Sequence, residues 1–60
     1  MRLCIFTSLD GEKIAINPEK VILIRKYEKH TEIFAESDVT VNVQESVQTA
    51  IDKVIGGKHE

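Results

Sequence analysis

The chain has 60 residues, of which ten are acidic and eight are basic, with a formal net charge of −2 and one cysteine. This length predicts a single domain, residues 1–60, with a small core. The near balance of charge excludes a general electrostatic attraction to nucleic acid. One cysteine excludes an internal disulfide, and Cys4, His30 and His59 lack the spacing of zinc ligands, so we expect no metal and no cofactor.

Two segments at the N-terminus predict a β-hairpin. Residues 2–9 carry apolar side chains on both faces, which is typical of a strand buried on two sides, and residues 12–17 alternate between apolar and polar. Asp10-Gly11 lies between them and favours a type I′ turn, in which both central residues need a positive φ. The first apolar run ends at Thr7 and is too short for a signal peptide or a membrane span, so we expect a cytoplasmic protein.

Three more strands are predicted in the middle of the chain. Asn17-Pro18 marks a turn, because proline fixes φ and lacks an N–H group while the asparagine side chain can bond the nearby backbone. Residues 21–27 follow, and their four consecutive aliphatic residues predict the centre of a sheet. Further strands are predicted at 31–36 and at 39–44, the latter with valine at every second position.

The apolar period changes near the C-terminus and predicts one helix over residues 46–55. Its apolar stripe consists of Val47, Ala50, Ile51, Val54 and Ile55. Ser46 is the expected N-cap, since its hydroxyl can accept a bond from the N–H groups of the first turn. Gly56-Gly57 is expected to end the helix in a left-handed conformation, which leaves 57–60 as a frayed tail. These elements predict an α+β fold, a small antiparallel sheet of four to five strands with one C-terminal helix.

One short helix covers only one face of such a sheet. The side chains predicted to load the opposite face are Cys4, Phe6, Ile22, Ile24 and Phe34. A large apolar face is more than a soluble monomer normally exposes. We therefore expect a homo-oligomer, most simply a two-fold dimer that buries these residues or pairs edge strands. The alternative is that sheet twist and long neighbours such as Lys26 and Glu32 cover this face in a monomer.

The sequence carries no pattern typical of an enzyme. A phosphate-binding loop needs several glycines before a helix, whereas Gly56-Gly57 follow one. Ser46 has no histidine within its segment to act as a base, and its capping position explains it. The carboxylates are typical of turns and surface. We therefore predict a non-enzymatic protein.

One local excess of basic residues surrounds Tyr27. It consists of Arg25, Lys26, Lys29 and His30. The simplest interpretation is a solvated strand end and turn. A contact with a partner molecule or with nucleic acid is the alternative, although the overall charge does not support nucleic acid.

A set of turn, cap and core residues along the chain carries a family resemblance. They are Thr7-Ser8-Leu9-Asp10-Gly11, Ile16-Asn17-Pro18, Val21, Ile24, Thr31, Ile33, Val43-Gln44-Glu45-Ser46-Val47, Ile51 and Val54-Ile55. Over roughly residues 5 to 55, the chain resembles the FlbD/SwrD family of small bacterial flagellar and swarming-motility proteins. That family usually has an acidic residue where Arg25 stands and a glycine in the turn at residues 35–38. The resemblance implies a non-enzymatic motility accessory that acts through protein contacts.

Two weaker resemblances imply nucleic-acid binding. The first rests on Thr7, Gly11-Glu12, Ile14, Ile16 and Asp38-Val39-Thr40-Val41 before a terminal helix. This layout is similar to the CsrA family of dimeric RNA-binding regulators, but Ser8 and either Val43 or Gln44 stand where that family has basic residues. Residues 16–55 are also similar to the strand-rich DNA-binding domain of LytTR response regulators. A small dimeric nucleic-acid-binding regulator is therefore the alternative hypothesis.

Overall fold

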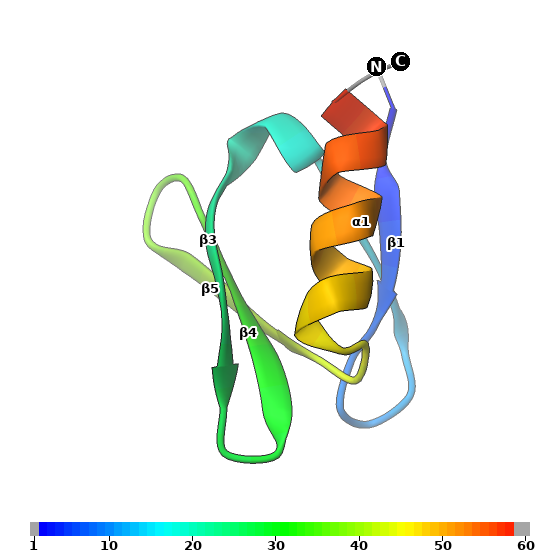
Figure 1. Ribbon diagram of the computed structural model, residues 1–60, viewed down its shortest axis with the longest axis vertical. Helices are drawn as coiled ribbons and strands as arrows, with labels where there is room; N and C mark the ends of the chain where they lie inside the picture. The colour runs from blue at the N-terminus through cyan, green and yellow to red at the C-terminus, as the bar shows by residue number, and fades with distance from the viewer. Residues whose placement is uncertain (1, 59–60) are drawn as a thin grey trace.

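Five antiparallel strands and one C-terminal helix make up residues 2–58, which the computed structural model describes (Figure 1). In chain order they are β1 (Cys4–Thr7), β2 (Lys13–Ile16), β3 (Val21–Tyr27), β4 (His30–Ala35), β5 (Val39–Val43) and α1 (Val47–Lys58). A short 3-10 helix, η1 (Pro18–Lys20), connects β2 to β3. The expected α+β fold with a C-terminal helix is confirmed, and every predicted strand is present.

The strands divide into two small sheets. β1 pairs with β2, while β3, β4 and β5 form a second sheet with β4 at its centre. An isolated bridge between Ser8 and Val43 joins the end of β1 to the end of β5. Beside this bridge, the Gln44 N–H donates to the Thr7 carbonyl at 2.8 Å. The bridge and this hydrogen bond link the two sheets where β1 and β5 end.

The sequence-based prediction that residues 21–27 occupy the centre of the sheet is wrong, because β3 lies at an edge. Its pairing with β4 shifts register between Val21 and Leu23, which is typical of a β-bulge. Val21 and Ile24 pack against the core, whereas Ile22 has 68% of its surface exposed. Both faces of β3 thus carry aliphatic side chains, but only the face with Val21 and Ile24 is covered by the core.

The turn between β1 and β2 differs from the predicted type I′ turn. Gly11 has a φ of 94°, as expected, but Asp10 does not adopt a positive φ. The Gly11 N–H donates to the Ser8 carbonyl at 3.0 Å, and the Ser8 N–H donates to the Glu12 carbonyl at 2.8 Å. The loop therefore has the three-residue geometry that needs one left-handed residue, at its last position. The Ser8 hydroxyl donates to the Asp10 carboxylate and lowers the pKa of Asp10.

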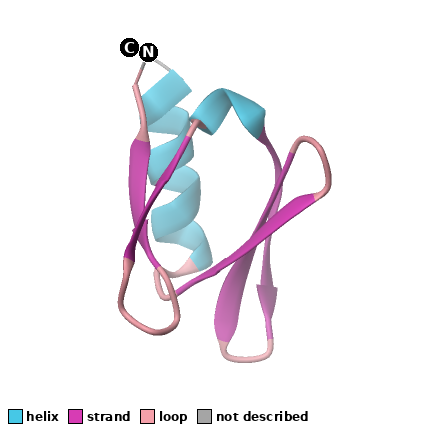
Figure 2. Cartoon of the chain, turned by 180° about the vertical axis from the view of Figure 1, so that it is seen from behind, coloured by secondary structure: helices cyan, strands magenta, loops and turns pink. Residues whose placement is uncertain are grey.

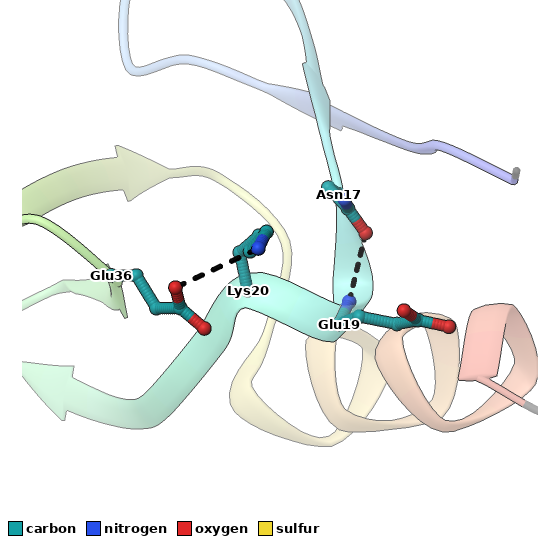
Figure 3. Close-up of polar contacts among 4 residues, drawn as sticks. All are labelled: Asn17, Glu19, Lys20 and Glu36. Carbon is teal, nitrogen blue, oxygen red and sulfur yellow. Dashed lines mark hydrogen bonds and ion pairs between the residues drawn. The ribbon is translucent and has the colours of Figure 1, made fainter.

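The predicted turn at Asn17-Pro18 is confirmed (Figure 3). The Asn17 side chain accepts a bond of 3.0 Å from the Glu19 N–H, and Pro18 is the first residue of η1. Lys20 Nζ lies 3.7 Å from a carboxylate oxygen of Glu36, and the Glu36 N–H donates to the Lys20 carbonyl at 2.9 Å. These contacts attach η1 to the turn that follows β4.

The core lies between α1 and the inner faces of the two sheets. Its buried apolar residues are Cys4, Phe6, Ile16, Ile33, Val43, Ala50 and Val54. Figures 1 and 2 show α1 running beside β1, with the three-stranded sheet on its other side. A single helix therefore covers residues from both sheets.

Cys4 and Phe6 were expected on the face away from the helix, and this prediction is wrong. The Cys4 Sγ donates to the Lys53 carbonyl of α1 at 3.1 Å, and Phe6 is fully buried. Both faces of residues 2–9 are apolar. Alternation therefore separates the two faces of this strand but cannot tell which of them the helix covers.

The helix begins as predicted but ends later. The Ser46 hydroxyl accepts a bond of 3.1 Å from the Thr49 N–H, which confirms the N-cap. α1 continues through Gly56 to Lys58, so the expected end at Gly56-Gly57 is wrong. A glycine in a helix lowers stability by only about 0.5–1 kcal/mol, which leaves such a helix free to continue. Of the predicted frayed tail, residues 59–60 lie outside the described part of the chain.

Candidate interaction surface

The face of β3 and β4 that points away from the core is a candidate interaction site. Directly opposed residues of an antiparallel pair share a face. Leu23 lies opposite Phe34, Arg25 opposite Glu32 and Tyr27 opposite His30, whereas Ile24 and Ile33 form the intervening pair that contacts the core. We name this face the outer surface and define it by Ile22, Leu23, Arg25, Tyr27, Glu32 and Phe34.

Arg25 lies at the centre of the outer surface. Its Nε donates to a carboxylate oxygen of Glu32 at 2.7 Å. Its guanidinium carbon is 5.3 Å from the centre of the Tyr27 ring and 5.5 Å from the centre of the Phe34 ring, within the range of cation–π attraction. The Tyr27 ring also meets the His30 ring edge-on, with their centres 5.8 Å apart. The guanidinium is thus held between two aromatic rings while its side chain stays half exposed.

Aliphatic side chains extend the outer surface toward the start of β3. Ile22, Leu23 and Tyr27 are all exposed although they are large and apolar. The bulge between Val21 and Leu23 explains this for Ile22, because it displaces that residue from regular alternation. Aromatic residues and arginine next to exposed aliphatic residues are typical of the centres of protein–protein interfaces.

The structure places the five predicted interface residues in three different environments. Cys4 and Phe6 belong to the core, and Ile24 is half-buried against it. Ile22 and the half-buried Phe34 contribute to the outer surface. The sequence prediction missed Leu23 and Tyr27. Tyr27 follows Leu23 and Arg25 at every second position of β3, so alternation alone could have placed it on the outer surface. No signal in the sequence indicated the bulge next to Ile22, which removes that residue from this alternation.

The four predicted basic contact residues are separated by the structure. Arg25 lies on the outer surface, whereas Lys26 and Lys29 line a hollow of about 260 Å³ between the β3–β4 turn and the start of α1. His30 belongs to both regions, because its ring contacts Tyr27 of the outer surface and the residue also lines the hollow. Ser46 and Glu45 line the same hollow from the other side.

Glu45 lines this hollow, and its carboxylate accepts a hydrogen bond from the Thr7 N–H of β1. Burial raises the pKa of its carboxyl, but the hydrogen bond from the Thr7 N–H and the nearby Lys53 outweigh it, so the pKa lies below its ordinary value. The carboxyl is therefore ionised at neutral pH. The groups that act on this carboxylate are thus the Thr7 N–H and Lys53, not the lysines that line the hollow.

Comparison with known proteins gives no identity. No protein-family model, no curated protein and no solved structure matches this chain.

Within residues 2–58, no group of three or more histidine, cysteine, aspartate or glutamate side chains is arranged to hold a metal ion. No helix in this part of the chain has the length and apolar character needed to cross a bilayer.

Proposed function

We propose that the chain is a non-catalytic protein-interaction module that forms a homodimer through the outer surface. The observation that carries this proposal is the grouping of exposed Ile22, Leu23 and Tyr27 around an arginine held between aromatic rings. A stable interface buries about 800 Å² on each partner, which is about a fifth of the 4116 Å² that one chain exposes. In the proposed dimer this area comes from the outer surface and from the edge of β3.

A two-fold arrangement suits the charges of the outer surface. Arg25 and Glu32 carry opposite signs and lie side by side. In a two-fold interface the same patch meets itself, so each arginine can approach the glutamate of the second copy. β3 is also an edge strand, and edge strands of two copies can pair.

The biological role proposed for this module is that of a cytoplasmic accessory in bacterial flagellar or swarming motility. It is supported by the resemblance to the FlbD/SwrD family, which covers most of the chain. In this proposal the module acts by contact with other proteins and carries out no chemical reaction.

Sedimentation equilibrium tests the dimer. Wild type is expected to be dimeric at micromolar concentration, and the double substitution Ile22→Ser with Leu23→Ser is expected to weaken association at least tenfold. Both side chains are exposed, so the fold should survive, as circular dichroism would verify. Leu9→Ser is the matched control, because Leu9 is an exposed apolar residue in the β1–β2 loop. A monomeric wild type, or a double variant that remains as dimeric as wild type, would contradict the proposal.

A second candidate function is nucleic-acid binding at the hollow next to α1. The grouping of Lys26, Lys29 and His30 around this hollow is the specific observation in its favour. Steeply salt-dependent retardation of mixed RNA or duplex DNA in a gel, reduced by Lys26→Glu with Lys29→Glu, would support it. Absence of retardation at low salt would contradict nucleic-acid binding and favour the protein-interaction role.

A further inference from the structure

The edge of β1 that faces away from β2 is only partly occupied. In an antiparallel strand, alternate residues direct their N–H and C=O groups to the same edge. The Ser8 N–H donates to the Glu12 carbonyl and so points toward the β2 side. Thr7, Ile5 and Leu3 therefore direct their backbone groups to the opposite edge.

In the occupied part of this edge, other segments of the chain already bond the outward backbone groups of β1, as an added strand would. The Thr7 carbonyl accepts from the Gln44 N–H at 2.8 Å, and the Thr7 N–H donates to the Glu45 carboxylate at 3.0 Å. Beyond this point the chain leaves the direction of β5 and enters α1. The Ile5 carbonyl accepts instead from Lys53 Nζ at 2.6 Å. The ammonium of Lys53 thus stands where the N–H of a neighbouring strand would donate.

The remaining groups of the edge have no such partner. Within residues 2–58, neither the Ile5 N–H nor the backbone of Leu3 is hydrogen-bonded across this edge. The side chains of Leu3 and Ile5 are 50% and 47% exposed. Unpaired strand edges flanked by apolar side chains are the places where extended peptides add to a sheet.

A shallow hollow of about 320 Å³, open to solvent over most of its extent, accompanies the open edge. Its lining residues are Arg2, Leu3, Cys4, Ile5, Lys53 and Gly56. Gly56 belongs to α1, and a side chain added there would meet no atom within 4 Å. The space around Gly56 is therefore open, and Leu3, Ile5 and Lys53 line the same hollow.

We propose that the hollow and the free edge at Leu3 and Ile5 bind an extended, acidic segment of another protein, which adds to β1 as a further strand. The backbone of the segment would bond the Ile5 and Leu3 groups, and one of its N–H groups would replace Lys53 Nζ at the Ile5 carbonyl. The displaced ammonium lies near one carboxylate of this chain, that of Glu45, and would pair in addition with a carboxylate of the segment, which is the reason for an acidic occupant. This site shares no residue with the outer surface and does not depend on dimer formation.

The competing explanation is that Lys53 only protects an exposed edge against aggregation. An NMR titration with a synthetic probe separates the two. The probe is an acetylated and amidated hexapeptide that alternates valine with aspartate, and its matched control has lysine in place of each aspartate. Binding should shift the Leu3 and Ile5 amide signals, slow hydrogen exchange at the Ile5 N–H, and be at least tenfold tighter for the aspartate peptide. Unchanged Leu3 and Ile5 signals at millimolar peptide, or equal binding of the two peptides, would overturn the proposal.

Two substitutions locate the site. Gly56→Leu adds a side chain to a residue that lines the hollow, so it should weaken binding of the aspartate peptide at least tenfold. Because leucine has a higher helix propensity than glycine, the substitution should not lower the melting temperature of the protein. Lys53→Met keeps the aliphatic stem and should abolish the preference for aspartate over lysine. Lys29→Met, at the far turn between β3 and β4, should change neither the affinity for the aspartate peptide nor the preference for it over the lysine peptide. Wild-type affinity in Gly56→Leu would contradict the proposed site, as would an unchanged preference in Lys53→Met.

Discussion

Ser37 is the residue at which a single substitution should stabilise the fold most directly. Ser37 and Asp38 have φ values of 66° and 61° in the turn between β4 and β5. The left-handed conformation is unfavourable for most L-residues by roughly 1–2 kcal/mol, and aspartate tolerates it better than serine does. Ser37→Gly should therefore raise the free energy of unfolding by about 0.5–1 kcal/mol, after the extra freedom of glycine in the unfolded chain is subtracted.

Urea unfolding monitored by circular dichroism would measure this change. Ser37→Ala is the control, because alanine keeps the Cβ atom that makes the conformation unfavourable. It should give no stabilisation. Equal unfolding free energies for Ser37→Gly and Ser37→Ala would mean that the left-handed φ is not a source of strain.

Single residues with local roles are also where sequence interpretation succeeded. Ser46 caps the helix and Asn17 caps η1, because each cap depends only on a side chain and an N–H group two or three residues away. Gly11 adopts the positive φ that its turn requires. The turn type at Asp10 was predicted wrongly, since it depends on how the two strands on either side pair, which the dipeptide alone does not determine.

At the scale of elements, the C-terminal end of α1 offers a clear test. Gly56 is exposed and helical, and a Cβ atom there would meet nothing within 4 Å. Gly56→Ala should therefore raise the free energy of unfolding by about 0.5–1 kcal/mol. Had Gly56 ended the helix in a left-handed conformation, the same substitution would destabilise the protein. Thermal unfolding of the two proteins distinguishes these outcomes by the sign of the change.

The junction of β1 with the start of α1 should be sensitive to acid. The Glu45 carboxylate accepts from the Thr7 N–H, and its pKa is lower in the folded protein than its ordinary value. Its stabilising effect is therefore complete above the ordinary carboxyl pKa and is lost as pH falls through the lower, folded pKa. Glu45→Gln should remove this part of the pH dependence.

The measurement is urea unfolding of wild type and Glu45→Gln at pH 7 and at progressively lower pH. The difference in free energy between the two proteins should shrink in the acid range, because protonated glutamate and glutamine carry the same charge. Glu45→Ala, which removes the acceptor, should lower stability at pH 7 by about 1 kcal/mol. A constant difference between wild type and Glu45→Gln across this pH range would contradict the role of the charge.

Elements were easier to predict from the sequence than the faces they bury. Alternation and the change of period located every strand and the helix, because these patterns are local. Which face of β1 meets α1, and whether β3 lies inside or at an edge, depends on pairing between distant segments. Cys4, Phe6 and Ile22 show the consequence: all three were assigned to one exposed face, and only Ile22 is exposed.

At the scale of the whole molecule, the size of the core limits how stable one chain can be. Phe6, Ile33 and Val43 are fully buried between two sheets and one helix. A domain of this length has little further apolar surface to bury by itself. Its exposed aliphatic residues, among them Ile22 and Leu23 of the outer surface, are therefore the apolar area that association with another chain would bury.

If the chain forms a dimer, its melting temperature should depend on protein concentration. If the folded chain associates and the unfolded chain does not, each tenfold rise in protein concentration above the dissociation constant adds to stability. A change of 1 kcal/mol moves the melting temperature of a domain this small by roughly 4–8 °C. The melting temperature of wild type should therefore rise by several degrees from low to high micromolar concentration. In Ile22→Ser with Leu23→Ser it should stay constant, and a wild-type melting temperature equally independent of concentration would show that the outer surface does not hold two chains together.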